Sequence, residues 1–162
     1  MNAPKYSAFT SAYSGIARQL RSNVFISDGL LKPSQEDPEK SSAKEYVAIW
    51  DTGASMTSIS RRVVSELALH EIARNMTNTA AGETETTIHR IHLWLPNRII
   101  IQKCLASCIP GLTDILGIDM LIGMDIISKG DITISNYQGK TVLSFRMPSV
   151  GITDYVKESE SS

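Results

Sequence analysis

One short segment of this 162-residue chain joins an apolar run to an acidic residue. The run Tyr46–Trp50 contains no charged residue and is followed directly by Asp51, Thr52 and Gly53. An apolar run of this length beside turn residues is typical of a buried strand, so we predict a strand that carries a carboxyl group at its end. Desolvation or a second carboxylate nearby suits such a group to proton transfer near neutral pH. The same tripeptide also occurs in ordinary strand-ending turns, so this segment alone leaves both interpretations open.

The rest of the chain also favours strands over helices. Nineteen isoleucines against three phenylalanines are typical of β-structure. A hairpin is indicated by two Thr-rich and Ile-rich segments around a tip of small residues at 80–83. We predict strands at 24–26, 46–50, 77–79, 84–95, 98–109, 121–123, 131–135 and 141–145, a helix at 61–70 with Ser60 as its N-cap, and a brief helical turn at 125–129. This pattern predicts an all-β, mostly antiparallel domain.

The length and the polar segments predict one domain with a tail at each end. At roughly 150 residues per domain, the chain has room for one domain and not for two. We assign residues 1–22 to an N-terminal extension and residues 23–148 to the domain, which includes a polar loop at 32–44. Residues 149–162 end in charged and serine residues with nothing to bury, and we expect a flexible C-terminal tail.

Charge and hydropathy argue against two classes of partner. Sixteen basic and seventeen acidic residues leave a net charge of -1, so the broad basic field that attracts nucleic acid or a membrane surface is missing. The first 20 residues contain no apolar stretch typical of a signal peptide. The aliphatic run Ile99–Ile101 is far shorter than the roughly 20 residues that span a bilayer. We therefore expect a cytoplasmic protein.

Few residues of this chain are suited to binding a metal. Cys104 and Cys108 are the only cysteines, which is too few for a disulfide framework or for a four-cysteine zinc site in one chain. We expect reduced thiols, although two such pairs in a dimer could bind a metal or respond to oxidation. Three histidines lack metal-ligand spacing and are expected to be structural: His70, His89 and His92. The prediction is no metal and no cofactor.

A second motif lies about seventy residues after Asp51, where Leu121, Ile122 and Gly123 precede the short predicted helical turn. The order of strand, Asp51–Ser55, hairpin with a small-residue tip, and Leu121–Gly123 resembles the retropepsins, the single-lobe aspartic proteases related to retroviral protease. The resemblance extends over about residues 44–147. It implies a closed retropepsin-like (acid protease) β-barrel with a ψ-loop, a flap hairpin and one or two short helices.

The resemblance also implies an aspartic endopeptidase that acts as a homodimer. The chain holds one Asp-Thr-Gly motif and has no room for a second lobe, so a working site would need Asp51 from two chains. One Asp51 would activate a water molecule, while its protonated mate polarises the scissile carbonyl group of a peptide. The Thr52 hydroxyl would hydrogen-bond across the dimer, and the Gly53 carbonyl would accept a hydrogen bond from the substrate backbone. No metal or organic cofactor takes part.

Contacts with an extended peptide substrate follow from the same resemblance. They are assigned to the loop after the catalytic residue, the flap tip and the second motif: Ala54, Ser55, Ala80, Ala81, Gly82, Ile122 and Gly123. The flap tip could equally be an ordinary exposed turn. Ser55 and Met124 depart from the retroviral pattern of an Asp and an Arg, and both halves of one ion pair are therefore replaced together.

Three other interpretations stay open at this level. Asp119 or Asp125 could complete a dyad with Asp51 within one chain, although a loop acid and a helix cap are the simpler assignments. The chain could also be a non-catalytic retropepsin-like β module for dimerisation or peptide binding, because a fold does not guarantee an activity. A phosphotransferase with Asp51 as nucleophile would need magnesium-binding acids and alternating strands and helices, which the β-rich pattern argues against.

Overall fold

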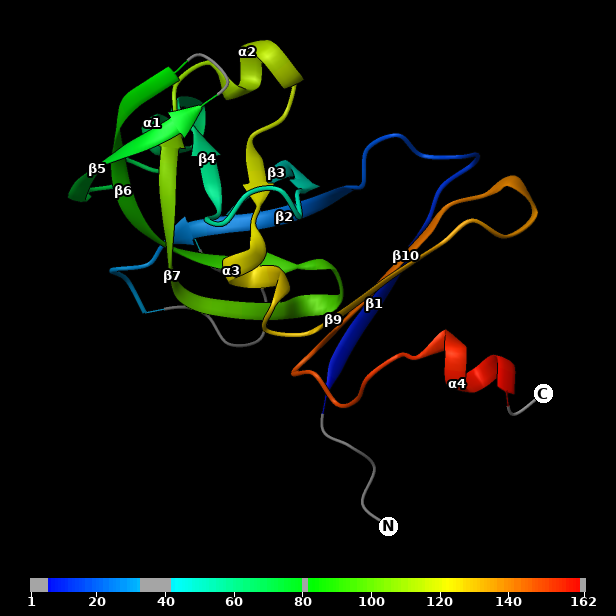
Figure 1. Ribbon diagram of the computed structural model, residues 1–162. Helices are drawn as coiled ribbons and strands as arrows, with labels where there is room; N and C mark the ends of the chain where they lie inside the picture. The colour runs from blue at the N-terminus through cyan, green and yellow to red at the C-terminus, as the bar shows by residue number, and fades with distance from the viewer. Residues whose placement is uncertain (1–5, 33–41, 80–81, 161–162) are drawn as a thin grey trace.

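The computed structural model describes residues 6–32, 42–79 and 82–160. Strands dominate, as the sequence predicts, and the helices are short (Figure 1). The strands are β1 (Ser7–Ala12), β2 (Arg21–Asp28), β3 (Lys44–Trp50), β4 (Ser58–Ser60), β5 (Glu71–Thr79), β6 (Gly82–Leu95), β7 (Ile99–Ile109), β8 (Met120–Ile122), β9 (Asp131–Ser135) and β10 (Val142–Met147). The helices are α1 (Arg61–Glu66), η2 (Pro96–Arg98), α2 (Leu112–Leu116), α3 (Met124–Ile127), η3 (Tyr137–Gly139) and α4 (Tyr155–Glu160).

Six strands close into a barrel. They follow the order β2-β3-β8-β4-β7-β6, and a second pairing of β2 with β6 completes the ring. The long strand β6 makes this closure, because Phe25 of β2 lies opposite Trp94 in its second half while its first half pairs with β5. The predicted closed β-barrel is therefore confirmed.

The barrel contains the predicted ψ-loop. Strand β8 lies between β3 and β4, parallel to β3 with Trp50 opposite Ile122, and antiparallel to β4 with Ser58 opposite Leu121. The chain therefore leaves β3, passes around the end of β8 and returns as β4. This loop contains Asp51, so the topology brings both sequence motifs to one end of the three strands.

A three-stranded sheet of order β1-β10-β9 lies beside the barrel (Figure 1). Its strand β1 lies within residues 1–22, the segment assigned from the sequence to an N-terminal extension, and pairs with β10 through Phe9 opposite Phe145. Helix α4 lies within residues 149–162, the expected C-terminal tail. The first and the last of the described strands, β1 and β10, thus pair in one sheet.

Strand β3 is covered on both faces, which explains its uninterrupted apolar sequence. Tyr46, Ala48 and Trp50 belong to the main core inside the barrel. Ile49 instead packs with Leu112 of α2 in a second, smaller cluster. Burial on both faces fixes the register of the strand, and with it the position at which Asp51 follows.

Other sequence predictions differ in length from the structure. The predicted helix 61–70 is shorter, since α1 ends at Glu66 and Ala68 has a φ of 49°, outside the helical range. Its predicted N-cap is confirmed, because the Ser60 side chain accepts a hydrogen bond from the Val63 N–H. The polar loop 32–44 lies largely outside the described residues, and Lys44 is already part of β3. Within the described residues, every helix is too short to cross a lipid bilayer.

Candidate active site

Asp51 lies at the end of β3 on a loop that its own hydrogen bonds define. The backbone N–H of Asp51 donates to the Ile122 carbonyl of β8 at 2.9 Å. Its carboxylate Oδ1 accepts from the Gly53 N–H at 2.9 Å, and its carbonyl accepts from the Ala54 N–H at 3.2 Å. The side chain is half-buried. These bonds direct one carboxyl group to the rim of the barrel and leave Oδ2 for other partners.

Gly123 allows the second motif to lie against this loop. A Cβ atom at this position would lie 2.7 Å from the Met56 carbonyl carbon and 2.9 Å from the Thr57 nitrogen. The φ of Gly123 is -89°, a value that any residue adopts, so close approach of the backbone is the reason for glycine here. Beside it, the Met124 N–H donates to the Ala54 carbonyl at 2.8 Å. The two motifs form one hydrogen-bonded unit.

Asp125 has a different role from the helix cap that the sequence suggests. Gly123 occupies the N-cap position of α3, and Asp125 lies in the first turn. Its Oδ1 accepts from the Thr57 N–H at 2.9 Å and from the Thr57 hydroxyl at 2.8 Å. The Thr57 hydroxyl oxygen in turn accepts from the Gly123 N–H at 3.1 Å. Sequence reasoning missed Thr57, because it is one ordinary threonine in a polar stretch.

Asp119 lies in the loop between α2 and β8, as the sequence predicts, and its side chain is buried there. It is 5% exposed, and its carboxylate oxygens lie 3.4 Å from the Val47 N–H and 3.5 Å from the Arg62 guanidinium. Val47 precedes Asp51 by four residues, which corresponds to about 13 Å along an extended strand. Asp119 therefore contacts β3 well before the end that carries Asp51. Because Asp125 bonds to Thr57, the structure supports neither acid as a partner for Asp51.

The sequence-predicted site residues have different environments. Thr52, Gly53 and Ser55 are exposed on the Asp51 loop, and Ala54 is half-buried. Ile122 is completely buried, so only its backbone takes part in this unit. Gly82, one of the three predicted flap-tip residues, begins β6 with a φ of 109°, which favours glycine. The positions Ala80 and Ala81 lie outside the described residues, while the flanking strands β5 and β6 pair up to Thr79 and Gly82.

The two departures from the retroviral pattern lie on the surface. Ser55 is exposed, and the side chain of Met124 is 38% exposed. In this chain, the backbone hydrogen bond from Met124 to Ala54 connects the two segments at this point. The replacement of both charges therefore leaves no buried ion without a partner at these two positions.

An aromatic cluster supports the strand that carries Asp51. The Trp50 ring lies with its centroid 5.0 Å from that of Phe145 and 5.8 Å from that of Phe9. Its Nε1–H donates to the Ser22 hydroxyl at 3.0 Å. Tilted aromatic contacts at these distances add to the stabilisation from burial. The three-stranded sheet thus packs directly behind the active-site loop.

The histidines and cysteines have separate environments in this chain. No group of three or more His, Cys, Asp or Glu residues suited to a metal ion occurs among the described residues. His92 is buried; its Nδ1 accepts from the Lys103 N–H at 3.2 Å, so Nε2 carries the proton that it donates to the Leu31 carbonyl at 2.9 Å. Both cysteines are free thiols, and burial raises the pKa of Cys104 to about 12.

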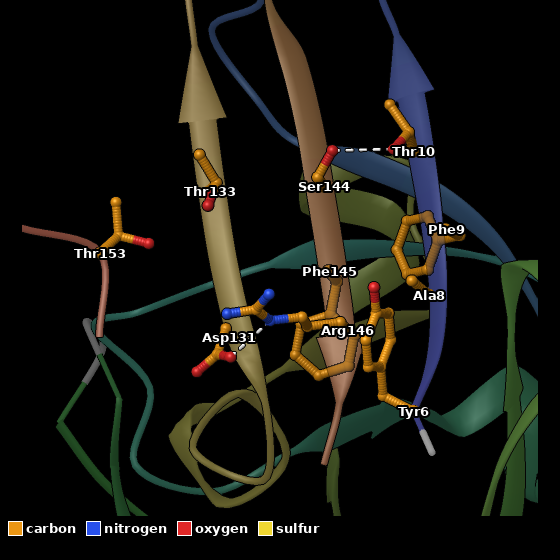
Figure 2. Close-up of a pocket in the computed structure, with 10 residues that line it drawn as sticks. All are labelled: Tyr6, Ala8, Phe9, Thr10, Asp131, Thr133, Ser144, Phe145, Arg146 and Thr153. Carbon is orange, nitrogen blue, oxygen red and sulfur yellow. Dashed lines mark hydrogen bonds and ion pairs between the residues drawn. The ribbon is translucent and has the colours of Figure 1, made fainter. Parts of the chain in front are cut away.

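A hollow of about 240 Å³ lies on the outer face of the three-stranded sheet (Figure 2). Arg146 crosses it, with Nε 2.6 Å from Asp131 and the guanidinium over the Tyr6 ring. Thr10 and Ser144 share a hydrogen bond of 2.8 Å on the same face. None of the residues that line this hollow belongs to the Asp51 loop. We therefore place the candidate active site at the rim of the barrel.

Comparison with known proteins agrees with this fold. The sequence model of the gag-polyprotein putative aspartyl protease family matches residues 41–129. A retropepsin-like aspartic protease from Rickettsia conorii has a similar structure, with a TM-score of 0.52 at 11% sequence identity over 90% of this chain and 98% of that chain. The retroviral protease-like domain of Ddi1 from Leishmania major gives a TM-score of 0.40 at 14% identity over 70% of this chain and 80% of that chain. No curated protein matches the sequence.

Proposed function

Because the chain belongs to the gag-polyprotein putative aspartyl protease family, we propose that it is an aspartic endopeptidase whose site is completed by a second copy of the chain. Each copy would contribute one Asp51. The substrate would be an extended polypeptide, and a water molecule held between the two carboxyl groups would attack the scissile carbonyl carbon.

The observation that carries this proposal is the ψ-loop. It holds Asp51 at the end of a buried strand, with the backbone of the loop hydrogen-bonded to Ile122 and Met124. The described residues of one chain hold one such carboxyl group, while water activation between acid and base needs two groups in opposite protonation states. A twofold axis beside the exposed Thr52 and Gly53 would supply the second group.

The chemistry follows from the proximity of two like charges. Two carboxylates a few ångströms apart cannot both ionise at low cost, so the pair would share one proton, as known for aspartic proteases. The ionised Asp51 would take a proton from water, and the protonated Asp51 would polarise the carbonyl oxygen. The tetrahedral intermediate would collapse when a proton returns to the amide nitrogen and the C–N bond breaks. The two residues would titrate as a pair.

The hairpin of β5 and β6 is suited to covering a bound peptide. Its two strands are paired up to Thr79 and Gly82. In the proposed enzyme this hairpin is the flap, whose backbone would hydrogen-bond the extended substrate while side-chain pockets select the sequence.

Mixed dimers test the proposal. Asp51→Asn keeps the shape of the side chain and removes the acid, so cleavage of a diverse peptide library between pH 4 and 7 should be lost while the dimer persists. In an equal mixture of wild-type and variant chains allowed to re-equilibrate, about one quarter of the dimers carry two Asp51 residues if pairing is random. Cleavage per dimer should fall to that fraction. Asp114→Asn, an exposed acid of α2, is the matched control.

Two results would count against the enzyme. Activity that falls only to one half in the mixture would indicate that each chain works alone. A folded dimer that cleaves nothing in the library would favour the alternative, a non-catalytic β module for dimerisation or peptide binding. Capture of library peptides by such an inert dimer would then support peptide binding.

A further inference from the structure

Hydrogen bonds from three different parts of the Asp51 loop hold it against the second motif and the start of α3. At the start of the loop, the Asp51 N–H donates to the Ile122 carbonyl. In the middle of the loop, the Ala54 carbonyl accepts from the Met124 N–H. The far end is held by Thr57, whose N–H and hydroxyl both donate to Asp125. Asp125 is therefore the only one of the three partners that uses its side chain.

The direction of each bond in this last contact can be assigned. A carboxylate accepts only, so the Thr57 hydroxyl must donate its single hydrogen to Asp125. Its lone pairs then face the Gly123 N–H, which lies 3.1 Å away. Thr57 is completely buried, so water cannot replace either partner without a rearrangement. The result is a relay from the Gly123 backbone through Thr57 to Asp125.

We propose that Asp125 is a positioning residue for the Asp51 carboxyl group and acts on it through Thr57. This inference rests on the proposed function. Asp125 fixes the backbone and the side-chain rotamer of Thr57, which fixes the far end of the loop against Gly123. With both ends held, the loop presents the Asp51 carboxyl group at one place. Two copies could then bring their carboxyl groups into register without rearrangement.

The geometry leaves little freedom for the loop to settle elsewhere. Gly123 already lies against the Met56 and Thr57 backbone, so the loop cannot move closer to α3. Loss of the Asp125 contact would release the loop in the opposite direction, away from Gly123. A displacement of about 1 Å in a catalytic group lowers the rate of an enzyme by about 100-fold.

Paired variants separate positioning from simple stability. Thr57→Val removes the hydroxyl and keeps the shape, whereas Thr57→Ser keeps the hydroxyl. Asp125→Ala removes the acceptor, Asp125→Asn keeps an oxygen at the same place, and Asp114→Ala removes an exposed first-turn acid of α2 as the control. The readouts are kcat and KM on one cleaved peptide, with the thermal midpoint and the dimer fraction recorded for each variant.

The expected result is a loss in kcat with little change in KM. Thr57→Val and Asp125→Ala should each lower kcat by about 100-fold and leave KM within about threefold. Thr57→Ser and Asp125→Asn should retain at least about a tenth of the wild-type kcat. The double variant of Thr57→Val with Asp125→Ala should lose no more than either single variant, because both changes break one relay. Wild-type kcat in a folded, dimeric Thr57→Val would overturn the proposal, and so would losses that multiply in the double variant.

A second measurement is independent of catalysis. The ¹³C signal of the Asp51 carboxyl carbon should move in Thr57→Val and Asp125→Ala and stay in place in Asp114→Ala. Amide exchange at Gly123 should become faster in Thr57→Val, because its acceptor is gone. If wild type cleaves nothing, the proposed function fails while these signals still decide the positioning role. An Asp51 signal that is unchanged in both variants would overturn it.

Discussion

Replacing Gly123 by alanine should force apart the two segments that form the candidate active-site unit. The backbone conformation of Gly123 suits alanine, so the added methyl group is the only new element. That methyl carbon would lie 2.7 Å from the carbonyl carbon and 2.9 Å from the carbonyl oxygen of Met56, and 2.9 Å from the nitrogen of Thr57. All three are backbone atoms, which cannot rotate away as the end of a side chain can.

The expected magnitude combines two opposing contributions. Overpacking of this kind costs about 1–3 kcal/mol. Alanine also lowers the conformational entropy of the unfolded chain, which stabilises the folded protein by about 0.4–1 kcal/mol. The net loss in the free energy of unfolding is then between about 0 and 2.6 kcal/mol relative to wild type. At about 2–4 °C per kcal/mol for a domain of this size, the melting temperature should fall by up to about 10 °C.

Gly15→Ala is the matched control, because a Cβ atom at Gly15 has no neighbour within 4 Å. It should leave the protein as stable as wild type or slightly more stable. Thermal and urea unfolding of the three proteins should be compared at one protein concentration, because dimerisation would make the midpoint depend on concentration. If Gly123→Ala is as stable as Gly15→Ala, the close approach between the second motif and the Asp51 loop is refuted.

Two further predictions concern the three-stranded sheet. Phe145→Ala should lower the free energy of unfolding by about 3–5 kcal/mol, because the ring is 1% exposed and packs on Trp50; urea unfolding measures this loss, and a loss below about 1 kcal/mol would contradict the aromatic cluster. The Ser149 hydroxyl and then the Arg146 guanidinium hold the pKa of Asp131 at about 2, below its ordinary value of 3.8. Since the folded-state pKa is the lower one, this stabilisation is complete above about pH 4 and is lost as the pH falls towards 2. Asp131→Asn should therefore remove the pH dependence of amide protection in the segment after β10 across that window, and an unchanged acid transition in the variant would contradict it.

The fold was predictable where burial leaves a periodic pattern. Strand β3 is covered on both faces and reads as an unbroken apolar run. Strand β6 alternates because Ile91, Leu93 and Leu95 face the core. The resemblance to a known family then supplied the closure of the barrel, which periodicity cannot supply. Patterns in the sequence indicate that a segment is a strand and do not indicate its neighbour.

The sheet at the chain ends shows this limit. Strand β1 has one buried large side chain, Phe9, among small polar residues, so its sequence resembles an extension more than a core strand. Its partner β10 lies far along the chain, with Thr10 and Ser144 134 residues apart. The pairing of two strands so far apart in the sequence is supported by the packing of Phe9 against Trp50. Such a contact between distant residues cannot be predicted from the pattern of a single sequence.

The candidate site was predictable in part for a similar reason. The placement of Asp51 and Gly123 in one hydrogen-bonded unit follows from the two motifs and their order. The contact of Thr57 with Asp125 joins residues 68 positions apart, and an acid in the first turn of a helix has an ordinary explanation without it. The proposed role of Asp125 could be inferred only from the structure, in which the Thr57 N–H and hydroxyl both donate to one oxygen of its carboxylate.

The pairing of the first strand with the last has a consequence for the order of folding. During synthesis, β1 is made first and can find its place only after β10 has been made. Contacts of such long sequence separation form slowly and late. Until then the Trp50 ring lacks its contact with Phe145, and the strand that ends at Asp51 lacks part of its packing in the main core. In the proposed enzyme, the packing behind the Asp51 loop would therefore be complete only after β10 has been made, and the nascent chain would gain its activity late in synthesis.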